Sequence, residues 1–241
     1  MTTSGHGGAV ATQDDNYDPY SAYGRENSSN IVGKMLKFSK GDYSVGDNEI
    51  EAGGKYIASM PNILVGWIRW EDQKPAETIM GLIVEGHRPQ KRDTLGFDDK
   101  SEWPTDKDGK PMDVWQETQY LVLKDTTDDE LYTFVTNSAG GRGAITKLVT
   151  SFGQKRRMNP GKLPIITLAV DSYKHKDPAY GKIKVPEFKI IGWVDQAEFD
   201  GVEPSESADT TKEAARQIQG MADAKNGGGA EASSTTERPR F

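Results

Sequence analysis

The chain has 241 residues, an apolar fraction of 34% and a formal net charge of −7, and it contains no cysteine. These values fit one or two domains, and they exclude disulfides and thiolate metal sites. The sequence opens without a basic segment followed by an apolar run, and its apolar runs are too short to cross a bilayer. We therefore expect a soluble protein of a reducing, cytoplasmic compartment.

Both ends of the chain are predicted to be disordered. Residues 1–30 are rich in Gly, Ser, Thr, Asn and Asp, and residues 201–241 include NGGG and SSTT runs. Such segments offer little apolar surface to bury. The remaining residues, about 31–200, are numerous enough for one hydrophobic core. The sequence thus predicts a single folded domain between an N-terminal and a flexible C-terminal tail.

The first half of this region predicts a hairpin and a long loop. Residues 34–39 (KMLKFS) suit a leading strand. Residues 62–70 and 76–85 are rich in β-branched, aromatic and aliphatic side chains around a polar break, which is typical of a β-hairpin. Residues 86–116 are polar and punctuated by prolines, and a loop of this length is usually functional.

The second half predicts a strand pair, a helix and two further strands. Residues 118–124 and 131–136 flank a turn, and residues 163–170 and 183–194 follow later, with Pro186 indicating an edge or a bulge. Between these two sets of strands, residues 144–152 are apolar at helical spacing, and Gly153 is expected to end the helix. The apolar positions are Ile145, Leu148, Val149 and Phe152.

Several strands, one helix and two further strands is the order of an OB-type barrel. That fold is a five-stranded Greek-key barrel, with its helix between the third and fourth strands. Many α+β folds share such an order. We therefore expect a mainly β protein, an OB-like β-barrel with one helix between strands 3 and 4.

Charge is divided sharply along the folded region. Residues 93–130 hold twelve acids and four bases, a formal charge of −8, whereas residues 142–193 hold eleven bases and three acids, a formal charge of +8. An asymmetry of this kind suggests a charged partner for the basic segment.

Aromatic residues are interleaved with the bases of this segment. Single-stranded nucleic acids are bound by cations that neutralise phosphates and by aromatic rings that stack on unpaired bases. The alternative is a solvated basic face with core aromatics, which suits Phe152 and Phe188 better than the tyrosines of the polar loop 171–181. The predicted nucleic-acid-binding residues here are Arg142, Lys147, Lys155, Arg156, Arg157, Lys162, Tyr173, Lys174, Lys176, Tyr180, Lys182 and Lys184.

Two further motifs are candidates for nucleic-acid contacts. Strand alternation places Trp67 and Arg69 on one face of their strand and Ile68 and Trp70 on the other. One face is a candidate stacking platform, and the alternative is that one of the two tryptophans lies in the core while the other packs under a loop. Residues 140–143 (GGRG) precede the predicted helix, whose N-terminus can hold a phosphate. They match neither of the two glycine-rich nucleotide-binding motifs, G-x-x-x-x-G-K-[ST] and G-x-G-x-x-G. A glycine turn with Asn137 or Ser138 near the cap is the favoured interpretation.

Enzymatic chemistry has no positive signal in the sequence. The acidic turn at residues 106–113 lacks the spacing of a calcium loop, and three histidines without cysteine make a zinc site improbable. No G-x-S-x-G motif is present. We expect a protein without cofactor or metal that is not an enzyme.

Residues 53–194 carry a resemblance to phage and prophage proteins encoded near replication and recombination functions. It lies in residues 66–70 (GWIRW), 80–81, 85–86, 115–118 (WQET), 132–134 (YTF) and 191–193 (IGW). Among such proteins, the single-stranded DNA-binding proteins with an OB fold are the most similar in function. The resemblance implies DNA binding in the host cytoplasm, and a C-terminal tail that recruits replication or recombination proteins. This tail ends in phenylalanine, as such tails can, but Arg238 and Arg240 depart from their acidic pattern.

Three hypotheses follow, in order of preference. The first is a single-stranded DNA-binding protein of little base specificity, in which the acidic segment lies away from the DNA or contacts the basic face of a neighbouring protomer. The second is a virion or assembly protein whose subunits join through those segments. The third is a metal-dependent nuclease that uses some of the carboxylates.

Overall fold

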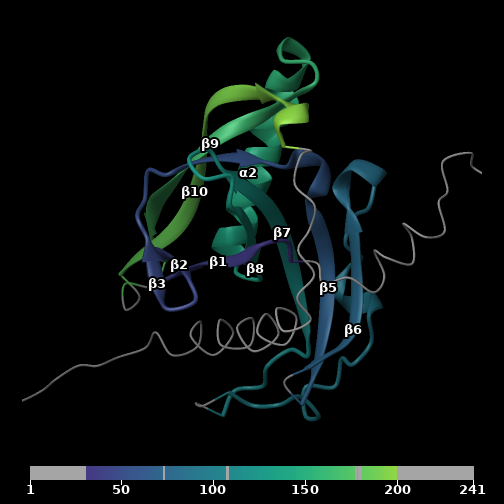
Figure 1. The fold of residues 1–241 in the computed structure, drawn as a ribbon. Helices are drawn as coiled ribbons and strands as arrows, with labels where there is room; N and C mark the ends of the chain where they lie inside the picture. Colours follow the sequence, from purple (N-terminus) through teal and green to yellow (C-terminus); the bar gives the residue numbers. More distant parts are fainter. Residues whose placement is uncertain (1–30, 73, 107–108, 177, 179–180, 200–241) are drawn as a thin grey trace, which may run out of the picture.

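The computed structural model describes residues 31–199 except 73, 107–108, 177 and 179–180 (Figure 1). Both predicted tails lie outside the described residues. Within the described part, ten strands form one hydrogen-bonded sheet and one α-helix packs on it. The elements are β1 (Lys34–Ser39), β2 (Asp42–Val45), β3 (Asn48–Ile50), β4 (Lys55–Ala58), β5 (Leu64–Glu71), β6 (Lys74–Leu82), β7 (Trp115–Asp125), β8 (Leu131–Thr136), α2 (Ala139–Lys155), β9 (Lys162–Lys174) and β10 (Lys182–Asp195).

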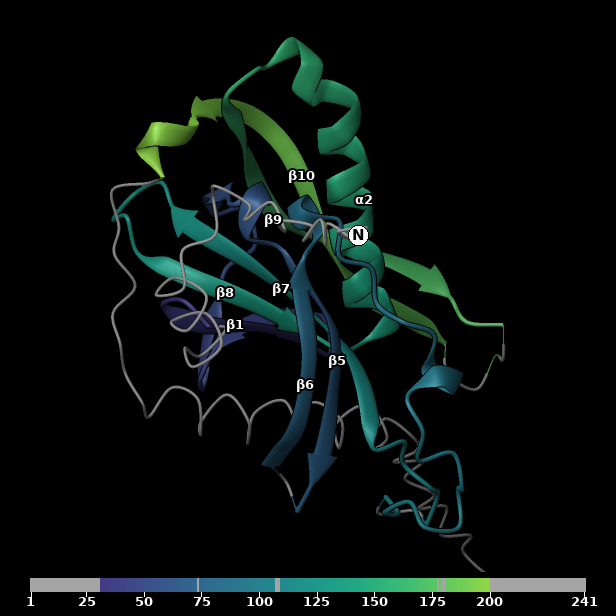
Figure 2. The same ribbon diagram turned by 90° about the vertical axis from the view of Figure 1, so that its right-hand side faces the viewer.

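The long strand β7 organises the sheet. One of its edges pairs with β8, while the other pairs with β5 near the start of β7 and with β4 near its end. β5 carries β6, and β4 leads to β9 and β10. Beyond β8 the sheet continues through the parallel neighbour β1 to β2 and β3. The β5–β6 hairpin therefore stands apart from a larger curved part of the sheet (Figure 2).

The curved part is a half-barrel whose ends meet through Tyr43. The buried Tyr43 hydroxyl on β2 donates to the carbonyl of Ala169 on β9 at 2.8 Å, and the Glu187 amide of β10 lies 3.3 Å from the same oxygen. The neighbouring Gly41 has φ 109°, and a Cβ there would lie 2.1 Å from Cδ of Lys184. The two ends of the sheet thus touch through side chains rather than through a strand ladder.

Hydrophobic cores cover both faces of the central strands. All six residues of β8 are buried, and the adjacent Phe134 and Val135 belong to different clusters. Adjacent strand residues point to opposite faces, so the two clusters lie on the two sides of the sheet. The larger cluster fills the half-barrel, and the smaller one, with Ile68, Trp70 and Tyr120, lies against β5 and β7.

The helix α2 is longer than predicted. Ile145 and Leu148 are buried, and Phe152 stacks on Trp193 of β10 with 6.0 Å between the ring centroids, so the predicted apolar face is confirmed. The expectation that Gly153 ends the helix is wrong, because α2 continues to Lys155. A glycine inside a helix costs only about 1 kcal/mol, which such packing offsets.

The glycine turn expected at residues 140–143 is also wrong, since these residues form the first turn of α2. Ser138 caps the helix by accepting a hydrogen bond from the Gly141 amide at 3.0 Å. Close packing explains two of the glycines. A Cβ at Gly140 would lie 2.6 Å from Val185, and one at Gly141 would lie 1.9 Å from the Thr136 hydroxyl.

The coarse prediction, a mainly β protein with one α-helix, is confirmed for the described residues. Both predicted hairpins form, as β5–β6 and β7–β8. Pro186 lies in β10, which ends the path of the sheet and carries a bulge between Ile190 and Gly192. The short strands β2, β3 and β4 were not predicted. Eight described strands precede α2, so the helix lies between the eighth and ninth described strands and not between strands 3 and 4 as predicted.

Candidate nucleic-acid interface

The basic segment is distributed along α2 and the two strands that follow it. The helix runs beside β10, because Gly140 meets Val185 near its start and Phe152 meets Trp193 near its end. The tip of the β9–β10 hairpin therefore lies near the N-terminal end of α2, and residues 155–157 lie at its C-terminal end (Figure 2). Seventeen helical residues separate the two ends by about 25 Å.

The hairpin tip concentrates positive charge on an ordered strand pair. Lys182 lies directly opposite Lys174 in the β9–β10 register, and Ile183 lies opposite Tyr173, whose side chain is 51% exposed. Like charges directly opposite each other destabilise a strand pair. We define the hairpin tip by five of its exposed residues, Tyr173, Lys174, Lys176, Lys182 and Lys184. No described acidic side chain lies within ion-pair distance of its lysines.

The helix end forms a second group of cations. Lys155, Arg156 and Arg157 are exposed, and among the described residues none of them has an acidic partner. Met158, which follows them, is 76% exposed. Lys147 is also exposed between the two groups, and the whole of α2 contains no aspartate or glutamate. We call Lys155, Arg156 and Arg157 the helix end.

The other predicted cations of this segment are already paired. Arg142 forms an ion pair with Glu117 at 3.2 Å and donates to the carbonyl of Asn137. Lys162 lies 3.9 Å from Asp195. Lys189, beside the predicted set, pairs with Glu187 at 3.2 Å. Arg142 therefore fastens the start of α2 to β7.

Trp67 and Arg69 lie on the β5–β6 hairpin, under the loop that precedes β7. Trp67 donates its indole N–H to the carbonyl of Gln90 at 2.9 Å. The Arg69 guanidinium lies 4.7 Å from the ring centre of Phe97 and pairs with Glu71 and Glu77 at 3.0 and 3.5 Å. The structure therefore gives both side chains partners of their own, and it does not bring them together with the hairpin tip.

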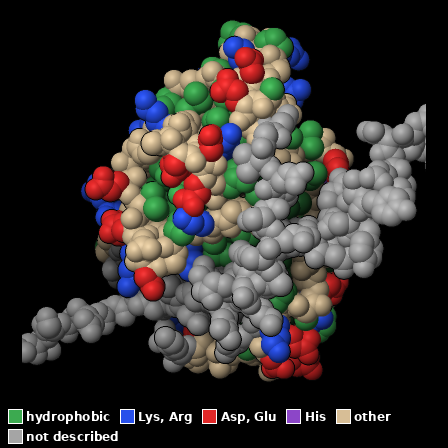
Figure 3. Space-filling view, in the orientation of Figure 1, with side chains coloured by type: hydrophobic (Ala, Val, Ile, Leu, Met, Phe, Trp, Pro, Cys, Tyr) green, Lys and Arg blue, Asp and Glu red, His purple; other side chains and the backbone are tan. Residues whose placement is uncertain are grey.

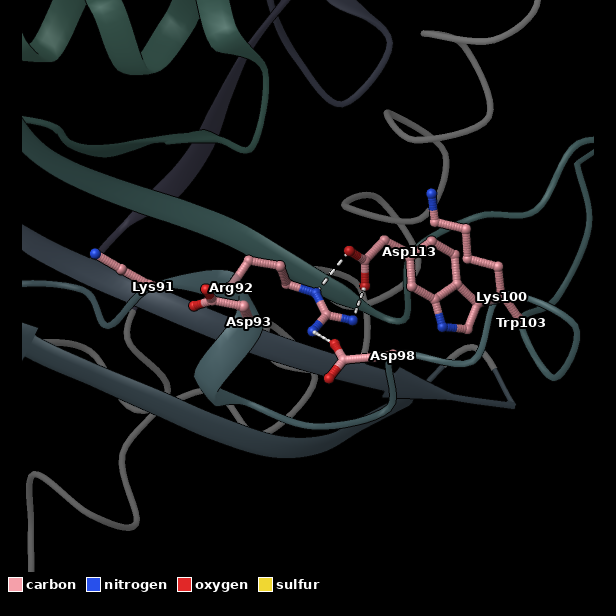
Figure 4. A pocket seen from close by; sticks show the side chains of 7 residues that line it. All are labelled: Lys91, Arg92, Asp93, Asp98, Lys100, Trp103 and Asp113. Carbon is pink, nitrogen blue, oxygen red and sulfur yellow. Dashed lines mark hydrogen bonds and ion pairs between the residues drawn. The ribbon is translucent and has the colours of Figure 1, made fainter.

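Arg92 holds this loop together, although the sequence did not single it out. It donates to both carboxylate oxygens of Asp113 at 2.7 and 2.8 Å and to Asp98 at 2.9 Å, and its guanidinium lies 5.5 Å from the ring centre of Trp103 (Figure 4). The hollow around Arg92 measures about 510 Å³. Its lining adds Lys91, Lys100 and Asp93, so three bases face three acids. The formal charges cancel there, and the hollow does not favour a polyanion.

The face of the molecule drawn in Figure 3 shows acidic and basic side chains side by side, with acids gathered over the lower end of the β5–β6 hairpin. This face therefore lacks the excess of one charge that a polyanion site needs. In the described residues, no three His, Asp or Glu side chains are placed to hold a metal ion, and no helix is long and apolar enough to span a membrane.

Tyr180 lies outside the described residues. The unpaired residues of the predicted set are thus the hairpin tip, Lys147 and the helix end. The like-charge pair at the hairpin tip was missed from the sequence, because the register that places Lys174 opposite Lys182 depends on the length of the turn between them. Comparison of the chain with protein-family models, with curated proteins and with solved structures gave no match.

Proposed function

We propose that this protein binds single-stranded DNA without catalysing a reaction, in phage-type DNA replication or recombination in the cytoplasm. The hairpin tip and the helix end neutralise phosphates, and Tyr173 stacks on an unpaired base. Binding of this kind has little base specificity, because every base has a π face.

The observation that carries the proposal is the contrast between two kinds of cation. Arg69, Arg92, Lys124 and Arg142 are each paired with carboxylates inside the fold. The lysines of the hairpin tip have no such partner in the described residues, and two of them oppose each other directly. The pair of Lys174 and Lys182 does not stabilise the fold, whereas a bound polyanion would offset the repulsion between the two ammonium groups.

An OB-like interpretation of the topology agrees with this placement. In an OB fold the loop between strands 4 and 5, which follow the helix, contacts nucleic acid. Here β9 and β10 follow α2, and the hairpin tip lies at the loop between them. The half-barrel form of the described sheet supports the comparison, whereas the eight described strands ahead of α2 differ from the three of an OB fold.

Fluorescence anisotropy with a labelled oligothymidine tests the proposal. We expect K174E/K182E to lose binding, and Y173A to lose about 1–3 kcal/mol of binding free energy. The matched control is K74E, which reverses one exposed lysine on β6, away from the hairpin tip. Equal affinities for wild type, K174E/K182E and K74E would contradict the proposed interface.

A further inference from the structure

Two basic groups at opposite ends of one helix constrain how a strand is bound. The hairpin tip lies beyond Val185, which meets Gly140 at the start of α2, and the helix end lies at the other end of a helix about 25 Å long. Neither group on its own spans more than a few phosphates. Their separation is fixed by the packing of α2 on β10, at Gly140 on Val185 and at Phe152 on Trp193.

The helix between the two groups is exposed along one face and contains no acidic residue. The exposed residues of α2 include Gly143, Thr146, Lys147 and Thr150. A Cβ at Gly143 or Gly153 would meet no described atom within 4 Å, so none of the described residues covers the helix at these positions. Lys147 provides a cation between the two ends.

We propose that one DNA strand lies along the exposed face of α2 and contacts the hairpin tip and the helix end at the same time. This inference rests on the proposed function. A stacked strand advances about 3.4 Å per phosphate, so 25 Å corresponds to roughly seven nucleotides, and to fewer in an extended strand. The full binding site is therefore about four to eight nucleotides long. Shorter DNA strands contact the hairpin tip alone, and longer strands contact both the hairpin tip and the helix end.

The length dependence of binding tests this path. Anisotropy is measured with oligothymidines of 3, 4, 6, 8, 12 and 16 nucleotides, for wild type, R156E/R157E, K147E and K74E. For wild type, affinity rises steeply up to about eight nucleotides and then only slowly. R156E/R157E leaves binding of the 3-mer within about twofold of wild type and lowers binding of the 12-mer at least tenfold, because the longer strand loses its second contact.

K147E lowers binding of the 12-mer at least threefold and leaves the 3-mer unchanged, while K74E changes neither. A salt series gives an independent readout. Each phosphate contact adds about 0.7 to the slope of log affinity against log salt. Contacts with Lys147, Arg156 and Arg157 therefore raise the slope for the 12-mer above that for the 3-mer by about 2, and R156E/R157E, which removes two of the three, lowers this excess to about 0.7.

The outcomes separate this inference from the proposed function. If R156E/R157E and K147E lower the affinity for the 12-mer no more than K74E does, the path along α2 is overturned. The hairpin tip would then be the whole binding site. No binding of any oligonucleotide by wild type would overturn the proposed function and the path with it. Circular dichroism and thermal unfolding of each variant confirm that the fold is intact.

Discussion

A single substitution in the hairpin tip distinguishes a role in DNA binding from a role in the stability of the fold. Lys182 opposes Lys174, so K182E replaces a like-charge pair by an opposite-charge pair. We expect the variant to gain about 0.2–1 kcal/mol in free energy of unfolding and to lose affinity for single-stranded DNA. Urea unfolding and anisotropy on the same sample check both signs. A variant that loses stability, or that keeps wild-type affinity, would contradict the account.

Tyr43 closes the half-barrel through one hydroxyl. Burial raises the pKa of this hydroxyl well above its usual range, so it stays protonated at any working pH. Y43F removes the group that bonds to Ala169 and Glu187, and we expect a loss of about 1–3 kcal/mol in the free energy of unfolding. Y173F, which removes an exposed hydroxyl, is the control and leaves stability unchanged. Equal unfolding midpoints for the two variants would show that the hydroxyl does not hold the sheet ends together.

Glu130 makes stability depend on pH on the acid side. A hydrogen bond from Lys34 and one from the Tyr132 hydroxyl at 2.7 Å hold the pKa of Glu130 below its usual value. The carboxylate therefore contributes stability above the ordinary glutamate pKa of about 4.3, and this contribution is lost as pH falls through the lower folded pKa. We expect E130Q to be less stable than wild type at pH 7 and to approach it toward pH 3. A difference in unfolding free energy that stays constant with pH would refute this assignment.

At the scale of one element, the glycines of α2 divide into two kinds. Gly141 packs on Thr136, so G141A is expected to destabilise the protein, because its Cβ would overlap the threonine hydroxyl. Gly143 meets nothing within 4 Å, so G143A is expected to stabilise it by about 0.5–1 kcal/mol. Thermal unfolding of the two variants checks the opposite signs, and shifts of the same sign would contradict the packing of the first helical turn.

Elements with strong local patterns could be predicted from the sequence. The β7–β8 hairpin and the apolar face of α2 follow from runs of apolar residues at strand and helix spacing. Strands β2 and β3 lack such runs, and they form because β1 and Tyr43 give them neighbours. The bounds of α2 depend on the cap at Ser138 and on Trp193, a residue distant in sequence, so local periodicity places the helix and misses its ends.

The candidate site, too, could be predicted from the sequence only in part. Composition and charge locate the basic segment, but they do not show which cations are paired. Arg142 and Lys174 lie in one basic stretch of sequence, yet Glu117 neutralises the first, and the second faces another lysine. That distinction depends on the register of β9 and β10 and on the position of α2 beside β7, both of which are set by tertiary contacts.

At the scale of the whole molecule, the opposite charges of residues 93–130 and 142–193 are only partly exposed on the surface. Several acids of the segment 93–130 are neutralised within the fold, as Asp113 and Asp98 are by Arg92, whereas the cations at the two ends of α2 are left exposed. We expect a surface of this kind to attract polyanions in spite of a net charge of −7. An assembly protein that used these cations to join subunits would instead form salt-sensitive oligomers without affinity for DNA.

The most direct test of the central claim is fluorescence anisotropy of the wild-type protein with labelled single-stranded and double-stranded oligonucleotides across a salt series. The account predicts binding that prefers the single strand and weakens with salt, with a slope of log affinity against log salt of about −3 to −5, from five to seven phosphate contacts at about −0.7 each. An absence of binding to single strands even at low salt would contradict it.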